Sequence, residues 1–375
     1  MRIISARPDP DFSCLKRAFR SDIKLDEGLT FFEKGRHALV YGLEKLNISP
    51  EASILVPAYM CHSTIAPLKD IGYKIIFFDI QEDLNCDLKM VEHLLKKYDI
   101  AAMLSVHYYG YPSNVGAIVK LCNQYNVKVI EDCSHSFLTQ IKGESIGSLG
   151  HIAIYSMRKT LPVPDGGALR FNVEMPLSPA VMVGNLGWHK EILYLVSRML
   201  ESMLCFIGFL NLYSTNINSF KNSLRSFVLT QNQNDNVLQR DCPIQASFQL
   251  KAYLYDKNYQ THVAKIRSRN YLLMAKEINQ LGFRIIYPDL PNGCVPQYLV
   301  VKDKTKRLTL WLREQGIGAA SWPGPELPQE VANRQVDFPV TNSLNDHLVM
   351  LPIHQSLNDS DILKMIDLLK KWVTI

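Results

Sequence analysis

The sequence lacks the marks of several protein classes. None of its eight cysteines forms a CxxC pair, so we expect neither a metal site nor a disulfide framework. The first residues, MRIISARPDPDF, contain no long apolar segment with a small-residue cleavage site, and we therefore expect no secretory signal. Internal repeats and low-complexity tracts are also missing. These absences favour a globular protein of the cytoplasm.

Charge is also scarce. Charged residues make up 21% of the chain and hydrophobic residues 47%, a composition typical of a packed protein. The 41 basic and 36 acidic side chains are scattered and leave a net charge of +5, without the basic stripe of a nucleic-acid-binding surface. An anionic small molecule matches this balance better. At 375 residues the chain has room for two or three domains.

Short apolar runs alternate with helix-length segments in the first half of the chain. Segments such as 90–97 and 115–125 have helical patterns and separate the runs, which predicts βαβ units. We therefore expect an α/β fold with a mostly parallel central sheet and helices on both faces, and chemistry at the carboxyl ends of its strands. The expected strands are Ile54–Val56, Lys74–Phe78, Ala101–Val106, Val127–Ile130, Ile152–Tyr155 and Ala168–Phe171.

After about residue 175 this rhythm stops. Residues 191–214 are strongly apolar, but Arg198 and Glu201 interrupt them, so we expect a buried or subunit-contact helix, with contact to a membrane surface as the alternative. The polar segment 220–240 marks a boundary between a large domain, residues 1–240, and a smaller α+β domain, residues 241–375. The smaller domain should hold helical periodicity over 244–281, strands at 284–286 and 297–301, and a helix at 359–372.

Two side chains follow expected strands at the carboxyl edge of the sheet. Asp132 ends the run VKVIED, and Lys159 follows the run IAIYS. Pyridoxal 5′-phosphate (PLP) chemistry needs a carboxylate that keeps the pyridine nitrogen protonated and a lysine that forms a Schiff base. The adjacent Arg158 would lower the pKa of such a lysine. Taken alone, Asp132 also fits an ordinary strand-end acid and Lys159 a solvated surface lysine.

A helix is expected to begin at Gly35, because the apolar residues that follow have helical spacing. The free N–H groups of its first turn and the helix dipole make an anion site that suits a phosphate. Arg36 adds a charged donor there. A glycine before a helix is common, so this signal is weak by itself.

Together these segments resemble one family, the DegT/StrS-type PLP-dependent aminotransferases of fold type I, most of which act on nucleotide-linked keto-sugars. The resemblance covers most of the chain and implies a homodimer that takes an amino donor, glutamate in most relatives, and works in cell-surface polysaccharide or amino-sugar biosynthesis. It rests on an ordered series of motifs: GRHAL, ILVPAYMCHSTIAPLKDIGYKIIFFDI, SVHYYGYP, VIEDCSHSF, GESIGSLGHIAIYS, KTLPVPDGG, RDCPIQAS, REQGIGA and LPIHQSL.

The resemblance also implies roles for single residues. Asp132 matches the partner of the pyridine nitrogen, and His135 matches the residue that contacts the ring hydroxyl. Lys159 matches the Schiff-base lysine by its distance to the Gly166-Gly167 pair, whereas Lys142 resembles a turn lysine. The phosphate-binding positions are Gly35, Arg36, His37 and Ser156.

Three positions depart from the family pattern. Two residues, not four, separate Ser156 from Lys159. Cys61 stands where many relatives have an aromatic residue on the cofactor ring, so Tyr59 or His62 is expected to take that contact. Leu238 replaces an asparagine that reaches the neighbouring subunit's phosphate, and we expect Arg240 to cross over instead.

Two other functions stay open at this point. One is a PLP-dependent sugar dehydratase, but relatives with that activity carry histidine in place of the lysine, so Lys159 argues against it. The other is a non-catalytic member of the fold that binds a ligand or assembles at a membrane surface. His107 matches a family motif too, and we interpret it as a structural, hydrogen-bonded histidine. The segment Trp322–Pro325 is a candidate wall of the substrate cleft.

Overall fold

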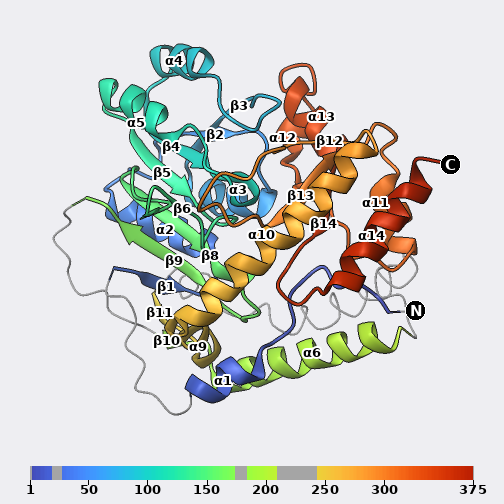
Figure 1. Ribbon diagram of the computed structural model, residues 1–375. Coiled ribbons are helices and arrows are strands. Elements are labelled where there is room, and N and C mark those ends of the chain that lie inside the picture. The colour runs from blue at the N-terminus through green and yellow to red at the C-terminus, as the bar shows by residue number, and fades with distance from the viewer. Residues whose placement is uncertain (1, 19–27, 174–183, 209–242, 375) are drawn as a thin grey trace.

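The computed structural model of the protein describes residues 2–18, 28–173, 184–208 and 243–374 (Figure 1). A seven-stranded sheet with the order β1-β9-β8-β5-β4-β2-β3 occupies the first half of the chain. The pairs from β3 through β8 are parallel, and β9 and β1 complete the sheet with antiparallel pairs. The α/β fold is therefore confirmed. The strands are β1 (Thr30–Phe32), β2 (Ser53–Pro57), β3 (Lys74–Phe78), β4 (Ile100–Val106), β5 (Lys128–Asp132), β8 (Ile152–Ser156) and β9 (Gly167–Phe171).

Helices cover both faces of this sheet. In α2 (Gly35–Lys45), a β-carbon on Gly42 would lie only 2.5 Å from Ile152, so glycine lets the helix pack closely on β8. In α5 (Val115–Gln124), the Cys122 thiol lies 3.7 Å from the Met103 sulfur of β4. In the sheet register Ile152, Ile130 and Leu104 lie beside one another, so their side chains point to one face, which α2 covers. Met103 precedes Leu104 in β4 and therefore points to the other face, which α5 covers. Helices α3 (His62–Ile71) and α4 (Leu88–Lys97) follow β2 and β3.

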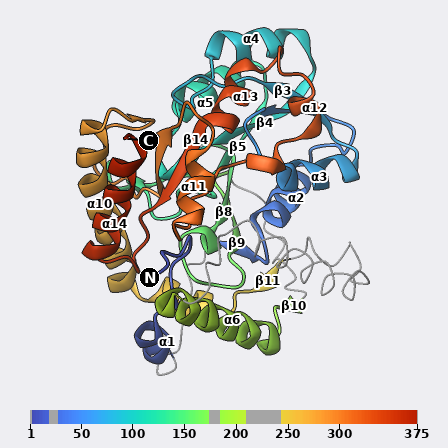
Figure 2. The same cartoon turned by 90° about the vertical axis from the view of Figure 1, so that its right-hand side faces the viewer.

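A second, antiparallel sheet carries the C-terminal part. Its strands are β12 (Arg284–Ile285), β13 (Tyr298–Lys302) and β14 (Leu348–Pro352), in that order. The long helix α10 (Lys257–Gln280) and the last helix α14 (Asp359–Trp372) run side by side along it (Figures 1 and 2). Three shorter helices, α11 (Leu308–Glu314), α12 (Gln329–Ala332) and α13 (Pro339–His347), lie between β13 and β14.

The segment 244–281, for which helical periodicity was expected throughout, contains two breaks. The segment contains the short strand β11 (Ile244–Gln245), then α9 (Phe248–Tyr255), then α10. Ser247 caps α9 by accepting the N–H of Leu250, and Asp256 caps α10 by accepting the N–H of Tyr259. Each cap begins a new helix without interrupting the apolar pattern.

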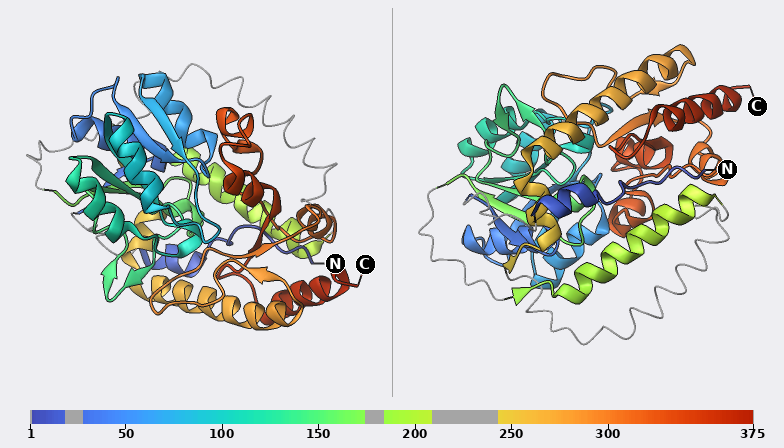
Figure 3. Two further views of the ribbon diagram at one scale, coloured as in Figure 1. Left: turned by 90° about the horizontal axis from the view of Figure 1, so that it is seen from above. Right: turned by 60° about the horizontal axis from the view of Figure 1, so that its bottom comes forward.

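Segments of the chain also pack across from the part with the seven-stranded sheet to the C-terminal part, and in the reverse direction. Ile4 pairs with Ile317 and packs in the C-terminal core, whereas Leu250 and Tyr253 of α9 pack in a core with Tyr155 of β8. Near α9 lie α1 (Phe12–Ala18) and the pair of β10 (Gly184–Asn185) with β11. Both termini lie at the same end of the molecule (Figure 3). The expected boundary at residues 240 and 241 falls outside the described residues, so the two-domain division stays a prediction.

The described part of the apolar segment lies in α6 (Trp188–Ile207), and residues 209–214 fall outside the described residues. The described residues bury only one face of this helix. Arg198 is buried, where it donates to Glu201 at 2.6 Å and to the Pro8 carbonyl at 2.9 Å. The other face of the helix is an exposed apolar stripe, which leaves subunit contact or membrane-surface contact open. No helix among the described residues is long and apolar enough to span a membrane. The stripe consists of Trp188, Ile192, Leu193, Val196, Met199, Leu200, Met203, Phe206 and Ile207.

Candidate active site

The carboxyl edge of the large sheet gathers most of the expected site residues. Strand β5 ends at Asp132, and β8 ends at Ser156, followed by a 3-10 turn, Met157–Lys159. The two strands are neighbours and parallel, so their ends share one edge. The neighbouring β2 and β4 bring Tyr59 and His107 to the same edge. Leu238 and Arg240 lie outside the described residues.

Asp132 is a buried carboxylate. Its side chain is largely shielded from solvent, and one oxygen accepts the N–H of Ser134 at 2.9 Å. Among the described residues no basic side chain forms an ion pair with it. A buried carboxylate needs a compensating positive group, because burying an unpaired charge is costly. A protonated pyridine nitrogen is such a group.

Lys159 is half-buried at the start of the loop after β8. Burial is the main cause of its lowered pKa; Asp132 opposes this shift, and Arg158 adds to it. The shift favours the neutral, nucleophilic amine. Lys142 is different: it lies at the exposed turn between β6 (Gln140–Ile141) and β7 (Glu144–Ser145), as expected.

His135 is neutral in this site. It is buried, and its pKa lies well below the usual value because burial and then the nearby Lys159 disfavour the charged ring. Its Nδ1 accepts the Tyr109 N–H at 3.4 Å, so the proton sits on Nε2. The ring stacks on that of Tyr109, with centroids 5.6 Å apart. His135 can therefore donate one hydrogen bond to an acceptor such as a ring hydroxyl oxygen.

The start of α2 has no side-chain cap. The N-cap residue Lys34 has no side-chain hydrogen bond to the helix, and the first turn holds no acid. A β-carbon on Gly35 would lie 3.0 Å from the Tyr155 carbonyl oxygen and 3.5 Å from both Ser134 Oγ and Ser156 Cβ, so glycine favours this close approach. Arg36 is half-buried and His37 is buried at the same turn. Gly35, Ser134 and Ser156 thus lie together at the start of α2, with Arg36 in the same turn. We call this group the α2 cup.

Aromatic side chains form the opposite wall. Tyr59 is fully buried, and its hydroxyl pairs with that of Tyr109 at 2.8 Å. Cys61 is buried with its thiol 3.0 Å from Ser63 Oγ, whereas His62 is exposed. Cys61 thus provides a thiol and no aromatic ring here, while His62 lies at the surface next to it.

Trp322 comes from the C-terminal part and closes the site. Its ring centroid lies 4.8 Å from that of His135 and 5.2 Å from that of Tyr59, both nearly edge-on. The Nζ of Lys159 lies 5.9 Å from the same centroid. The sequence marked this segment only as a candidate cleft wall. Its place beside Lys159 depends on how the C-terminal part folds over the sheet, which no local pattern reveals.

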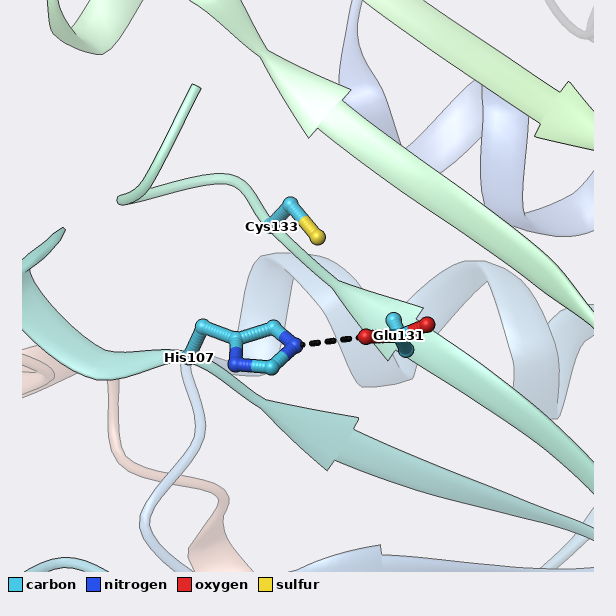
Figure 4. A group of neighbouring side chains, drawn as sticks. All are labelled: His107, Glu131 and Cys133. Carbon is cyan, nitrogen blue, oxygen red and sulfur yellow. Dashed lines mark hydrogen bonds and ion pairs between the residues drawn. The ribbon is translucent and has the colours of Figure 1, made fainter. Parts of the chain in front are cut away.

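A buried polar network links β4 and β5 near the carboxyl edge of the large sheet. His107 Nε2 lies 2.9 Å from Glu131 Oε2, and the Cys133 thiol lies near both (Figure 4). The other His107 nitrogen accepts the Ser113 N–H, and the other Glu131 oxygen accepts the backbone N–H groups of residues 149 and 150. These three side chains could be arranged around a metal ion, but hydrogen bonds already occupy the histidine and the carboxylate. The network is structural, as expected for His107.

These residues fit PLP. Asp132 supplies the anion for a protonated pyridine nitrogen, Lys159 an amine for the aldehyde, and the α2 start an anion cup for the phosphate. Fold and site together define a PLP-dependent enzyme with a mostly parallel sheet.

The chain belongs to the DegT/DnrJ/EryC1/StrS aminotransferase family, whose sequence model matches residues 12–205. It is an aminotransferase, and PLP is its cofactor. Over 315 residues it is 21% identical to the GDP-perosamine synthase of Vibrio cholerae. The matched region covers 79% of this chain and 81% of that protein.

Two further similarities extend this comparison. A UDP-4-amino-4,6-dideoxy-N-acetyl-β-L-altrosamine transaminase of Campylobacter jejuni is 29% identical over 148 residues, which cover 36% of this chain and 39% of that protein. A Streptococcus pneumoniae structure solved in the PLP form aligns with a TM-score of 0.71 at 13% identity and covers 100% of this chain and 99% of that one. At that identity the structural match shows the fold alone.

Proposed function

We propose that the enzyme transfers an amino group, from glutamate as donor, to a keto group of a nucleotide-linked sugar in polysaccharide or amino-sugar biosynthesis. The observation that carries this proposal is the placement of Lys159 and Asp132 at adjacent strand ends in a chain of this family. The Vibrio and Campylobacter relatives are named for nucleotide-linked amino sugars, which supports the acceptor class.

Each proposed role follows from a side chain's surroundings. When bound, PLP supplies an electron-withdrawing ring that stabilises negative charge at the substrate's amine-bearing carbon. Asp132 holds the proton on the pyridine nitrogen because its buried carboxylate forms no ion pair with a basic side chain among the described residues. His135 donates its Nε2 proton to the ring oxygen. Lys159 moves a proton to and from the substrate carbon, for which its lowered pKa suits it.

The phosphate is held at the start of α2 by Gly35, Arg36, His37 and Ser156. Tyr59 and Cys61 lie beside the cofactor ring, with Tyr59 or His62 supplying the contact to its face. Trp322 is a further aromatic group, and its ring borders both Lys159 and Tyr59. Of the alternatives, a dehydratase is disfavoured by the presence of Lys159.

The test is a half-reaction. PLP-loaded protein is mixed with glutamate, and 2-oxoglutarate is measured; a nucleotide-linked 4-keto-sugar or 3-keto-sugar is then added, and the aminated sugar is identified by mass spectrometry. We expect stoichiometric 2-oxoglutarate in the first step and an aminated sugar in the second. A protein that binds PLP without releasing 2-oxoglutarate would contradict transamination.

We also propose a cytoplasmic homodimer. The seven described cysteines are all buried thiols that form no disulfide with one another, which suits a reducing compartment. The apolar stripe of α6 is a surface that a second copy would cover. Arg240 is the residue we propose to reach the neighbouring active site.

A further inference from the structure

Basic side chains from several segments gather outside the α2 cup. They are Arg7 of the N-terminal segment, Lys34 and Arg36 at the start of α2, Arg158 beside the catalytic lysine, and Lys190 in the first turn of α6. We call these five residues the basic cluster. Lys34 pairs with Glu33 at 3.4 Å. The other four form no ion pair within the described part of the chain.

Backbone contacts show why three of these cations lie together. A β-carbon on Gly167 would collide with the carbonyl of Lys34, and one on Gly166 would lie 3.1 Å from the backbone nitrogen of Arg158. The adjacent glycines thus hold the α2 start against the loop that carries Lys159. Arg36 follows directly in the same turn.

The N-terminal segment and α6 bring the other two. Arg198 of α6 donates to the Arg7 carbonyl at 3.4 Å, which places Arg7 against this helix. At the start of α6, Glu191, next to Lys190, accepts from the N–H groups of Phe248 and Gln249. The adjacent Ser247 donates to Asp165, the neighbour of Gly166, so the start of α6 also lies near the glycine pair. Burial raises the pKa of Tyr194 in α6, and Arg198, Arg7 and Arg158 oppose that shift, so this helix faces the cluster.

The cations repel one another. Burial and then Arg7 lower the pKa of Arg158, and Arg36 contributes in the same direction. Burial also lowers the pKa of Lys34, with Glu33 opposing and Arg36 adding to the shift. The helix dipole adds roughly half a positive charge at the same place. A bound anion would relieve this repulsion, so the cluster favours an anionic ligand.

One phosphate leaves part of this charge uncompensated. Five cations and one acid, Glu33, leave about four positive charges, whereas a phosphate monoester carries about two negative charges. The members differ in exposure: Arg36 is half-buried in the turn that begins at Gly35, whereas Arg7 and Lys190 are exposed. Protein atoms crowd the Arg158 guanidinium and lower its pKa, but the side chain as a whole still reaches solvent.

We propose that Arg7, Arg158 and Lys190 form a second anion site, outside the cofactor's phosphate cup, that binds the diphosphate of the nucleotide-linked acceptor. The inference rests on the proposed function. A diphosphate carries the remaining two charges, and the two arginines offer planar forks of donors to its oxygens. Glutamate, with two carboxylates, is the other anion that the reaction supplies.

Calorimetric titration of the PLP-loaded enzyme with UDP, GDP and dTDP tests the site. At least one nucleoside diphosphate should bind, and Arg7→Gln, Arg158→Gln and Lys190→Gln should each weaken that binding. We expect about tenfold or more for each arginine, since hydrogen bonds to charged groups contribute about 1.5–3 kcal/mol. The PLP content, measured by absorbance after desalting, should not change. Lys142→Gln, at an exposed turn, is the matched control and should bind like the wild type.

Other outcomes overturn the inference in distinguishable ways. Wild-type diphosphate affinity in all three variants would show that the diphosphate binds elsewhere. Loss of PLP from the variants would assign the cations to the cofactor phosphate, and weaker 2-oxoglutarate binding with unchanged diphosphate binding would assign them to the amino donor. If the wild type releases 2-oxoglutarate from glutamate but binds no nucleoside diphosphate, the proposed acceptor class itself fails.

Discussion

At the scale of single residues, burial sets the protonation of the site. Burial lowers the pKa values of Lys159 and His135 and so favours their neutral forms. Asp132 is buried as well, but it accepts a backbone N–H and lies close enough to Lys159 to raise the pKa of that lysine. One carboxylate, one neutral amine and one neutral imidazole match the roles proposed for Asp132, Lys159 and His135.

Asp132→Asn tests the carboxylate. An amide has the same shape but cannot keep the pyridine nitrogen protonated, so PLP should stay bound while kcat falls by about 10²–10³-fold, as when one charge-stabilising group is removed from an active site. Steady-state kinetics and the absorbance of the bound cofactor measure the two effects. Turnover close to that of the wild type would show that Asp132 does not hold this proton.

His354 predicts how stability depends on pH. Its Nε2 lies 2.9 Å from the Ser5 carbonyl oxygen, and burial lowers its pKa to about 3. As pH falls below about 6.5, the unfolded chain binds this proton and the folded chain does not. Above pH 6.5 the neutral His354 therefore makes its whole contribution to the unfolding free energy. Between pH 6.5 and about pH 3 the unfolding free energy falls by up to about 1.4 kcal/mol for each pH unit.

His354→Gln keeps a donor for the Ser5 carbonyl and removes the titrating ring. We expect a shallower fall in unfolding free energy between pH 6.5 and 4.5, measured by urea denaturation. His93→Gln, at an exposed position of α4, is the control and should follow the wild type. Parallel curves for wild type and His354→Gln would rule out this contribution.

At the scale of elements, β5 depends on Glu131. Its two oxygens accept from the His107 ring and from the backbone of Leu149 and Gly150, which ties the strand to β4 and to the loop before β8. In Glu131→Gln an NH2 group replaces one of the two acceptor oxygens, so it faces the N–H of His107 or the backbone N–H groups and cannot accept from them. We expect a loss of about 2–4 kcal/mol in unfolding free energy at pH 7, because a buried group is left without its partner. Glu144→Gln, in the exposed β7, should change it little; equal stability of both variants would contradict the network's role.

The elements of the large sheet could be predicted because their signals are local. Central parallel strands are buried on both faces and therefore read as short apolar runs, and all six expected strands lie in this sheet. Strand β14 was not predicted, since it pairs with β13 across about 50 residues and directly follows α13. The break between α9 and α10 was missed because the apolar pattern continues across Asp256.

The candidate site divides in the same way. Asp132 and Lys159 could be found because strand ends locate them, and Gly35 because a helix begins there. Trp322 could not be placed, since 163 positions separate it from Lys159 and only the packing of the C-terminal part brings them together. The basic cluster was not recognised because its five members come from segments that are far apart in the sequence.

At the scale of the whole molecule, α6 bears on assembly. Its buried Arg198 binds the N-terminal segment, while nine large apolar side chains of the same helix face outward. A surface of this kind is typical of a protein–protein contact. Light scattering of the PLP-loaded enzyme at micromolar concentration should give the mass of two chains, and a fully active monomer would refute a shared site.

Subunit mixing then tests Arg240. Lys159→Ala and Arg240→Ala should each be inactive alone, and mixed dimers should regain one intact site if the two residues come from different chains. Up to a quarter of the wild-type activity is expected at equal amounts, since about half of the dimers are mixed and each has one site. No recovery despite confirmed subunit exchange would exclude a role for Arg240 across the interface.

The position of the covalent lysine tests the central claim most directly. PLP-loaded protein is desalted, reduced with borohydride, digested and mapped by mass spectrometry. We expect the pyridoxyl group on the peptide that contains Lys159, and no such group in Lys159→Ala, which should unfold at nearly the same urea concentration as the wild type. A pyridoxyl group on Lys142, or on any lysine other than Lys159, would contradict the account.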